Sequence, residues 1–107
     1  MPIKAHPGEV WIVDLGMAAK ERPVLVLAFP LPDDARSLVV VAPLTSQIRG
    51  YRGEVDIGKP RWLPKQSAVN IQGLASIDHH ALQRKLGTLS TVDMNAVKMA
   101  LKDLLAL

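Results

Sequence analysis

The chain has 107 residues, which suffices for one compact domain and is too short for two, so we expect residues 1–107 to form a single domain. Hydrophobic residues make up 49% of the chain and aromatic residues only 4%, which excludes a disordered polymer and predicts an aliphatic core. The absence of cysteine excludes disulfides, thiolate metal sites and a cysteine nucleophile, and the net charge of +3 fits a polyanionic partner as well as an ordinary, weakly basic domain.

Short strands separated by proline, glycine and aspartate are predicted for most of the chain. Residues 9–15 place apolar side chains on two alternating faces and predict the first strand. Pro23 opens the apolar run 24–29, and a second apolar run, 37–42, follows a connection rich in turn-forming residues. We therefore predict that these two runs form a central antiparallel hairpin.

Further short strands are predicted downstream of this hairpin. Residues 54–57 alternate polar and apolar side chains, 67–72 do so over part of their length, and 74–77 are another candidate strand. No predicted helix lies between the strands to make a parallel crossover. The pattern therefore favours a small, strongly bent barrel or sandwich over a parallel sheet.

The last part of the chain predicts one long helix. Ser90 has the form of an N-cap, with Asp93 at the third helical position. Apolar residues then recur at helical spacing, namely Met94, Val97, Leu101 and Leu104. Because the other face is polar, we expect the helix to pack on the barrel, and a contact with a second copy stays open.

Nothing in the chain predicts a membrane segment. The longest apolar runs, 24–31 and 38–44, are too short to span a bilayer, and the first residues, MPIKAHPGEV, lack the apolar core of a signal peptide. We expect a cytoplasmic protein with no membrane contact.

The predicted hairpin creates a candidate phosphate site. Antiparallel pairing of 24–29 with 37–42 would place Arg22 opposite residue 44 or 45, so that its guanidinium shares one rim with the hydroxyls of Thr45 and Ser46. A guanidinium forks onto two phosphate oxygens and a hydroxyl donates a further hydrogen bond, which suits phosphate chemistry. The alternative, a solvated Arg22 beside an ordinary turn at Thr45-Ser46, stays open on position alone.

Other polar and aromatic residues are candidate contacts for a polynucleotide. Asn70 and Gln72 point to the same face of their predicted strand, and amides of this kind can hydrogen-bond to base edges in unstacked RNA. Trp11, Tyr51 and Trp62 offer rings for stacking, although core packing is the better interpretation of the tryptophans. The remaining candidates around the rim are Lys20, Ser46, Gln47 and Arg49.

The sequence contains no pattern typical of a metal or cofactor site. His6 lies in the predicted N-terminal tail, and His79-His80 lies beside Asp78 in a predicted turn. Neighbouring residues on a strand point in opposite directions, and no carboxylate and histidine recur at the spacing of metal ligands. No phosphate-cradling glycine loop, nucleophile elbow or catalytic carboxylate pair is present. We therefore expect no metal and no cofactor.

Several segments together resemble the MazF/PemK family of toxins. These segments are PGEVWIVDLG, ERPVLVLA, VVVAPLTSQ and the closing RKLGTLS with its helix, in the family's order and spacing from residue 7 to residue 107. The resemblance implies an SH3-like antiparallel β-barrel of the MazF/Kid/CcdB type with a C-terminal α-helix, a homodimer, a cognate antitoxin protein and cleavage of single-stranded RNA. It also assigns catalysis to Arg22 and Thr45, through attack of a ribose 2′-hydroxyl that yields a cyclic phosphate.

Two departures from the family pattern qualify these expectations. Many members carry an acidic residue and a glutamine where this chain has Gln72-Gly73, and the segment 16–21 is shorter than the first loop of many relatives. The alternatives are a catalytically weak or inactive member that binds RNA or protein through the same basic rim, and a related barrel that poisons DNA gyrase. The presence of both Arg22 and Thr45 argues against the gyrase poison.

Overall fold

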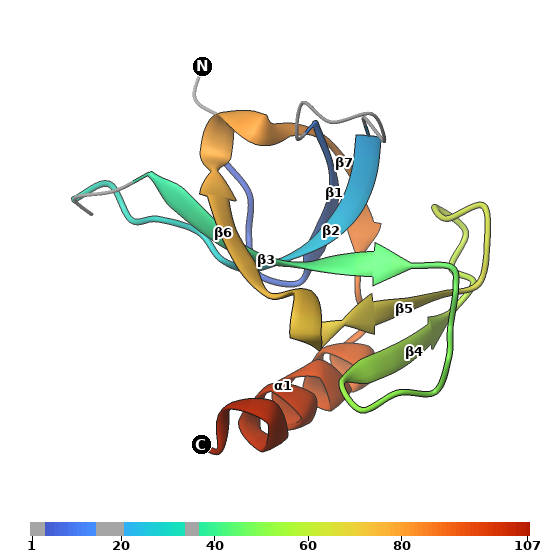
Figure 1. Cartoon of the computed structure of the whole chain (residues 1–107). Helices are drawn as coiled ribbons and strands as arrows, with labels where there is room; N and C mark the ends of the chain where they lie inside the picture. Colours follow the sequence, from blue (N-terminus) through green and yellow to red (C-terminus); the bar gives the residue numbers. More distant parts are fainter. Residues whose placement is uncertain (1–3, 15–20, 34–36) are drawn as a thin grey trace.

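The computed structural model describes residues 4–14, 21–33 and 37–107 (Figure 1). Within these residues the chain forms an antiparallel sheet of seven strands with one α-helix at its C-terminal end. The elements are β1 (Glu9–Asp14), β2 (Glu21–Ala28), β3 (Leu38–Thr45), β4 (Glu54–Gly58), β5 (Ser67–Asn70), β6 (Ala75–Asp78), β7 (Leu82–Thr88), the 3-10 turns η1 (Ile71–Gly73) and η2 (His79–Ala81), and α1 (Thr91–Leu105).

Strand β3 connects the two halves of the sheet. The strands follow the order β4-β5-β3-β2-β1-β7, and β6 also pairs with β3. Along one edge, β3 pairs first with β6 and then with β5, and the register shifts by three residues between these pairings, which is the length of η1. In Figure 1 the sheet curls around β1, β2 and β7, and α1 lies below β4 and β5.

Two apolar clusters explain why the central strands are apolar on both faces. On β2, Leu25 belongs to the cluster that also packs against α1, whereas Val24 and Val26 belong to the second cluster, together with Val39 and Val41 of β3. Successive strand residues point to opposite faces, so each strand supplies both clusters. The near-continuous apolar runs of the central hairpin follow from this double burial.

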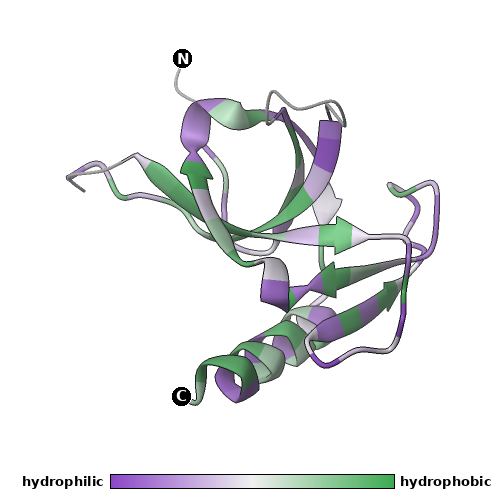
Figure 2. Ribbon diagram, viewed as in Figure 1, coloured by the Kyte–Doolittle hydropathy of each residue, from purple (hydrophilic) through white to green (hydrophobic). Residues whose placement is uncertain are grey.

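The C-terminal helix packs on the sheet as predicted. The Ser90 hydroxyl accepts a hydrogen bond from the Asp93 N–H at 3.1 Å, which caps the helix. Val97 is fully buried, and Met94, Leu101 and Leu104 pack against the same cluster. Figure 2 shows apolar and polar residues alternating along α1. In the described part of the chain, no helix is both long and apolar enough to cross a membrane.

The predicted fold class is confirmed, with corrections at the strand ends. The structure is mostly antiparallel with one C-terminal helix, and its barrel-like sheet is not closed. Pro23 lies inside β2 and does not open it, because β2 already pairs with β1 at Asp14 and Glu21. The proline is tolerated since pairing with β3 ends at Val24, so no hydrogen bond is required on that side.

Two further corrections concern β5 and β7. The predicted strand 67–72 ends at Asn70, and Gln72 lies in η1, so the prediction that these two amides share a strand face is wrong. Strand β7 was not predicted, because most of its side chains are polar and exposed and only Leu82 is buried. It joins the sheet through its backbone pairing with β1.

Candidate functional site

A pocket opens where β2 and β3 part. The last pair between them is Val24 with Pro43, after which Leu44 and Thr45 pair with β5 on the other edge of β3. The space left by this divergence has a volume of about 560 Å³. Its lining residues are Glu21, Arg22, Pro23, Leu44, Thr45, Ser46, Gln47, Leu63, Pro64, Lys65 and Ser67.

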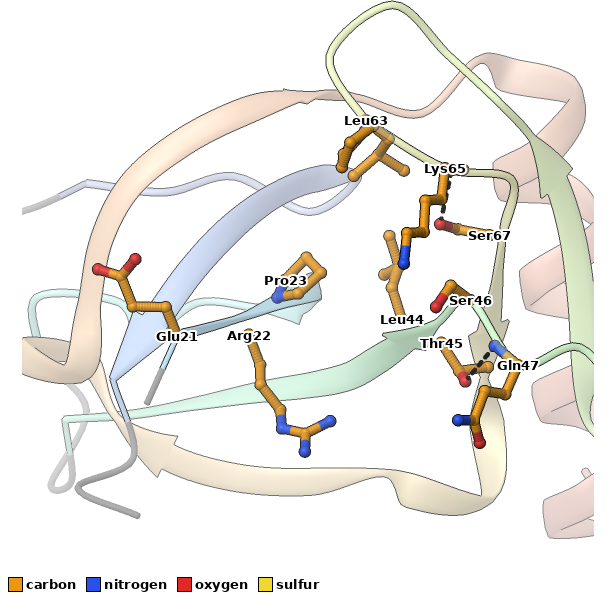
Figure 3. Close-up of a pocket in the computed structure, with 11 residues that line it drawn as sticks. Glu21, Arg22, Pro23, Leu44, Thr45, Ser46, Gln47, Leu63, Lys65 and Ser67 are labelled. Carbon is orange, nitrogen blue, oxygen red and sulfur yellow. Dashed lines mark hydrogen bonds between the residues drawn. The ribbon is translucent and has the colours of Figure 1, made fainter. Parts of the chain in front are cut away.

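Arg22 and Thr45 line this pocket together. Each lies two residues beyond the Val24–Pro43 pair, so the register continued past this pair would place them opposite one another, in the arrangement expected from the hairpin. Arg22 is exposed and Thr45 is half-buried. Figure 3 shows the Arg22 side chain extending from β2 below the hollow and Thr45 at the far end of β3. A guanidinium and a hydroxyl therefore border one space that is open to solvent.

The loop that leaves β3 orients the Thr45 hydroxyl. The Thr45 Oγ1 accepts a hydrogen bond from the Gln47 N–H at 3.1 Å. A hydroxyl that accepts from the backbone keeps its own proton available for donation. Ser46 and Gln47 are exposed beside it. This end of the pocket thus presents hydrogen-bond donors to a ligand.

Lys65 is a lining residue that the sequence-based site assignment omitted. It lies in the connection between β4 and β5, two residues before β5 begins at Ser67. Ser67 is only 6% exposed, and its hydroxyl donates a hydrogen bond to the Lys65 carbonyl at 3.0 Å. This bond holds the Lys65 backbone beside the pocket. In Figure 3 the Lys65 side chain reaches toward Ser46 from the loop side. The pairing of Thr45 with Ala68 brings the start of β5, and with it Lys65, beside the end of β3. This proximity depends on the order of the strands in the sheet, which the sequence pattern did not predict.

The pocket's charged groups favour an anionic ligand. Arg22 and Lys65 contribute two positive charges, and Glu21 is the carboxylate among the lining residues. A phosphodiester oxygen is a matched acceptor for a guanidinium, an ammonium and a hydroxyl.

A second hollow adjoins the first and contains most of the other predicted RNA contacts. It shares Thr45 and Gln47 with the first pocket and has a volume of about 250 Å³. Its remaining lining residues are Arg49, Tyr51, Arg52, Glu54, Asn70 and Gln72. Although Asn70 and Gln72 lie in different elements, the structure brings both to this hollow. Lys20 lies outside the described residues.

The aromatic side chains divide into packed and exposed groups. Trp62 packs against the cluster beneath α1 and covers Gly87, where a Cβ would overlap the indole. Trp11 packs against the other cluster and donates its Nε1–H to Glu9 at 3.0 Å. Both tryptophans therefore serve packing, as expected, whereas Tyr51 is 62% exposed.

A cluster of potential metal ligands lies at the other end of β3. Among the described residues, Asp78, His79 and His80 place ligand atoms within 4.8 Å of one another. The histidines lie in the turn η2, as predicted, but the expected divergence of their side chains is wrong, because strand alternation does not apply in a turn and the two ring centroids lie 4.0 Å apart. The Asp78 carboxylate accepts from the His80 N–H at 2.8 Å, which contributes most to lowering its pKa. Asp78 pairs with Leu38, at the opposite end of β3 from Thr45, so this cluster is separate from the pocket.

The curled antiparallel sheet, the packed C-terminal helix and the cationic pocket define a small β-barrel-like protein with a phosphate-compatible rim. The sequence model of the family described as "PemK-like, MazF-like toxin of type II toxin-antitoxin system" matches residues 6–105. The chain belongs to this family.

Individual relatives agree with this assignment. The chain is 34% identical over 98 residues to the "Probable endoribonuclease MazF5" of Mycobacterium tuberculosis (strain ATCC 25618 / H37Rv), covering 89% of this chain and 87% of that protein. Among solved structures, the Mycobacterium tuberculosis toxin MazF-mt6 superposes with a TM-score of 0.78 at 28% identity, over 92% of this chain and 97% of that one. An endoribonuclease in complex with its cognate antitoxin, from Mycobacterial species, gives a TM-score of 0.81 at 25% identity, over 97% of both chains.

Proposed function

We propose that this chain is the toxin of a type II toxin–antitoxin system and that it cleaves single-stranded RNA in the pocket between β2 and β3. The observation that carries the proposal is the meeting of Arg22, Thr45 and Lys65 around one solvent-open hollow. The similarity to relatives named as endoribonucleases supports the same reaction class.

The proposed reaction is an internal transesterification. The ribose 2′-oxygen attacks the neighbouring phosphorus and loses its proton, the bond from phosphorus to the 5′-oxygen breaks, and that oxygen gains a proton. The products are a 2′,3′-cyclic phosphate and a free 5′-hydroxyl. The Arg22 guanidinium stabilises the charge that develops on the phosphorane oxygens, and the Thr45 hydroxyl orients the phosphate. Because an arginine pKa exceeds about 12, we assign Arg22 mainly this electrostatic role.

This chemistry needs no metal ion. A divalent cation that activates a phosphodiester is ordinarily held by several carboxylates, whereas this pocket combines two cationic side chains with Glu21. Arg22 and Lys65 supply positive charge where a metal would otherwise supply it. Cleavage is therefore expected to proceed in EDTA.

The proposal is tested by incubating purified protein with a mixed-sequence single-stranded RNA in EDTA and identifying the new ends. We expect cyclic phosphate and 5′-hydroxyl termini. Arg22→Ala should reduce the rate at least a hundredfold, and Thr45→Val should reduce it at least tenfold, because each removes stabilisation of the transition state. The matched control is Arg84→Ala, which removes an exposed arginine on β7 outside the pocket and should retain the wild-type rate.

Intact RNA at micromolar enzyme would contradict the proposed catalysis. Salt-sensitive RNA binding without product would then identify a non-catalytic member of the family that uses the same basic rim.

Family membership supports a proposal for the biological setting. We propose that residues 1–107 act as one toxin domain in the cytoplasm, that two copies form a homodimer, and that a cognate antitoxin inhibits the toxin. A disordered antitoxin segment that folds over the pocket would compete directly with RNA. Co-expression with the protein encoded by the neighbouring reading frame, followed by the cleavage assay, tests this inhibition.

A further inference from the structure

Three potential metal ligands meet at the end of the sheet that is remote from the pocket. Asp78 is the last residue of β6, and His79 and His80 begin the turn η2. One ligand atom from each of the three side chains lies within 4.8 Å of the other two. Figure 1 shows η2 at the end of the molecule opposite α1, β4 and β5. This cluster, which we call the Asp78 cluster, is thus spatially independent of the proposed RNA site.

Backbone contacts hold the Asp78 cluster in place. The Asp78 carboxylate accepts from the His80 N–H at 2.8 Å and so caps η2. The His79 N–H donates to the Ser37 carbonyl at 3.1 Å, and Asp78 itself pairs with Leu38 of β3. The turn is therefore fastened to the start of β3, and binding of an ion requires little further ordering of the backbone.

The His79 ring is the most firmly held of the three side chains. It is 16% exposed, and it contacts Phe29 edge-on, with ring centroids 6.3 Å apart. Phe29 in turn packs against the second apolar cluster. The side chains of Asp78 and His80 are 64% and 81% exposed. One ligand is thus oriented by packing, and the other two leave the cluster open to an ion from solvent.

The distances within the cluster match those between ligands of one metal ion. The Asp78 Oδ1 lies 2.9 Å from the His80 Nδ1 and 3.8 Å from the His79 Nδ1. The Ser37 carbonyl oxygen lies 3.2 Å from the His79 Nδ1. Two tetrahedral ligands, each about 2.0–2.1 Å from a zinc ion, are about 3.3 Å apart. The observed separations lie on both sides of this value, so small side-chain rotations suffice to form the site.

Each histidine can present the nitrogen that such an ion requires. A neutral imidazole carries its proton on either Nδ1 or Nε2. When the proton is on Nε2, the Nδ1 lone pair faces an oxygen, which belongs to Ser37 for His79 and to Asp78 for His80. A cation then takes the place of the hydrogen-bonded proton between nitrogen and oxygen. Two imidazoles with a carboxylate suit Zn²⁺, whereas Mg²⁺ and Ca²⁺ favour ligand sets made of oxygen alone.

We propose that Asp78, His79 and His80 form a surface binding site for Zn²⁺, with the Ser37 carbonyl as an additional oxygen ligand. The site lies outside both hollows, so the ion takes no part in RNA cleavage and instead joins η2 to the start of β3. Because Ser37 and the histidines are distant in the chain, the complete ligand set exists only in the folded protein, and Zn²⁺ stabilises the fold. This site is the exception to the sequence-based expectation that the chain binds no metal.

Titration of untagged, EDTA-treated and desalted protein with zinc chloride, followed by isothermal titration calorimetry, tests the site. We expect one equivalent of Zn²⁺ to bind and Mg²⁺ not to bind. His80→Ala removes an exposed ligand, and Asp78→Asn removes the charge but keeps an oxygen for the His80 N–H. Each should weaken binding at least tenfold. The matched control is His6→Ala, since His6 is also exposed and lies 3.5 Å from a carboxylate oxygen of Glu9, and its affinity should equal that of the wild type.

Nitrogen-15 NMR of the histidine rings identifies the ligand atoms. The chain has three histidines, so each ring can be assigned by substitution. Zn²⁺ should shift the Nδ1 signals of His79 and His80, leave their Nε2 atoms protonated and leave His6 unchanged. His79→Asn keeps a side-chain donor for the Ser37 carbonyl while removing the ring nitrogen, and it should weaken binding at least tenfold without unfolding the protein.

Thermal unfolding provides a second measurement. Zn²⁺ should raise the unfolding midpoint of wild type and of His6→Ala, and should leave that of His80→Ala unchanged. No binding by the wild type, equal affinity in His80→Ala, equal binding of Mg²⁺, or ring shifts confined to His6 would each overturn the site. These measurements need no RNA, so their outcome is independent of whether the proposed cleavage is observed.

Discussion

Glu9 connects three parts of the chain, and its ionisation should make stability depend on pH. Its side chain is 12% exposed at the start of β1. One carboxylate oxygen accepts from the Trp11 Nε1–H at 3.0 Å and the His6 N–H at 2.9 Å, and the other lies 3.1 Å from the Lys85 ammonium of β7. Burial raises the pKa of Glu9, but these donors together outweigh it and lower the pKa from 4.5 to about 2.

The size and sign of the effect follow from this pKa. Lowering the pKa of Glu9 from 4.5 to about 2 contributes at most about 3 kcal/mol to the free energy of unfolding. Solvent screening of the ion pair near the surface reduces the expected contribution to about 1–2 kcal/mol. Because the folded pKa is below the unfolded one, this contribution is fully present above pH 4.5 and is lost as the pH falls toward 2. Glu9→Gln keeps an oxygen acceptor for Trp11 and loses the charge that pairs with Lys85.

The measurement is urea unfolding of wild type and Glu9→Gln at pH 7, 4.5 and 2.5. We expect the wild type to be more stable by about 1–2 kcal/mol at pH 7 and the difference to be mostly gone at pH 2.5. Glu21→Gln exchanges an exposed carboxylate and should change stability by less than about 0.5 kcal/mol throughout. A Glu9→Gln difference that is constant from pH 7 to 2.5 would refute the assignment of the stabilisation to the ionised carboxylate.

Three substitutions test the packing and the helix cap that stabilise the fold, each by urea unfolding at pH 7. Gly87→Ala should destabilise by about 2 kcal/mol or more, because the new Cβ overlaps Trp62, and an unchanged midpoint would contradict that contact. Ser90→Ala removes the cap on the Asp93 N–H and should cost about 1 kcal/mol, whereas Ser90→Asp should restore most of the loss if capping is the cause. Val97→Ala should cost about 2 kcal/mol through the cavity it leaves, and a loss below about 0.5 kcal/mol would mean that the helix is not anchored there.

The elements predicted correctly are those with a strong local pattern. The helix has a capping serine, an acidic third position and apolar residues at helical spacing, and the structure begins it at Thr91. The central hairpin is apolar on both faces, and its observed register, Val24 with Pro43, agrees with the expected approach of Arg22 to Thr45. The family segments contributed the rest of the fold prediction, because alternation alone left a barrel and a sandwich equally open.

Elements that depend on distant partners were missed or misplaced. Strand β7 has polar, exposed side chains and is a strand only because β1 supplies its backbone hydrogen bonds. Gln72 falls in a 3-10 turn, since β5 and β6 both pair with one edge of β3 and the register shifts by three residues between the two pairings.

The chain's local chemistry was sufficient to predict a mainly antiparallel fold, a capped C-terminal helix and the residues Arg22 and Thr45 as a candidate pair. Only the tertiary structure places Lys65 and the second hollow beside Thr45, because β5 pairs with the end of β3 although more than twenty residues separate the two strands in the chain. Periodicity reports which side of a strand is buried, whereas the choice of neighbouring strand depends on how the whole sheet buries its two apolar clusters. The composition of the pocket therefore becomes visible only in the folded protein.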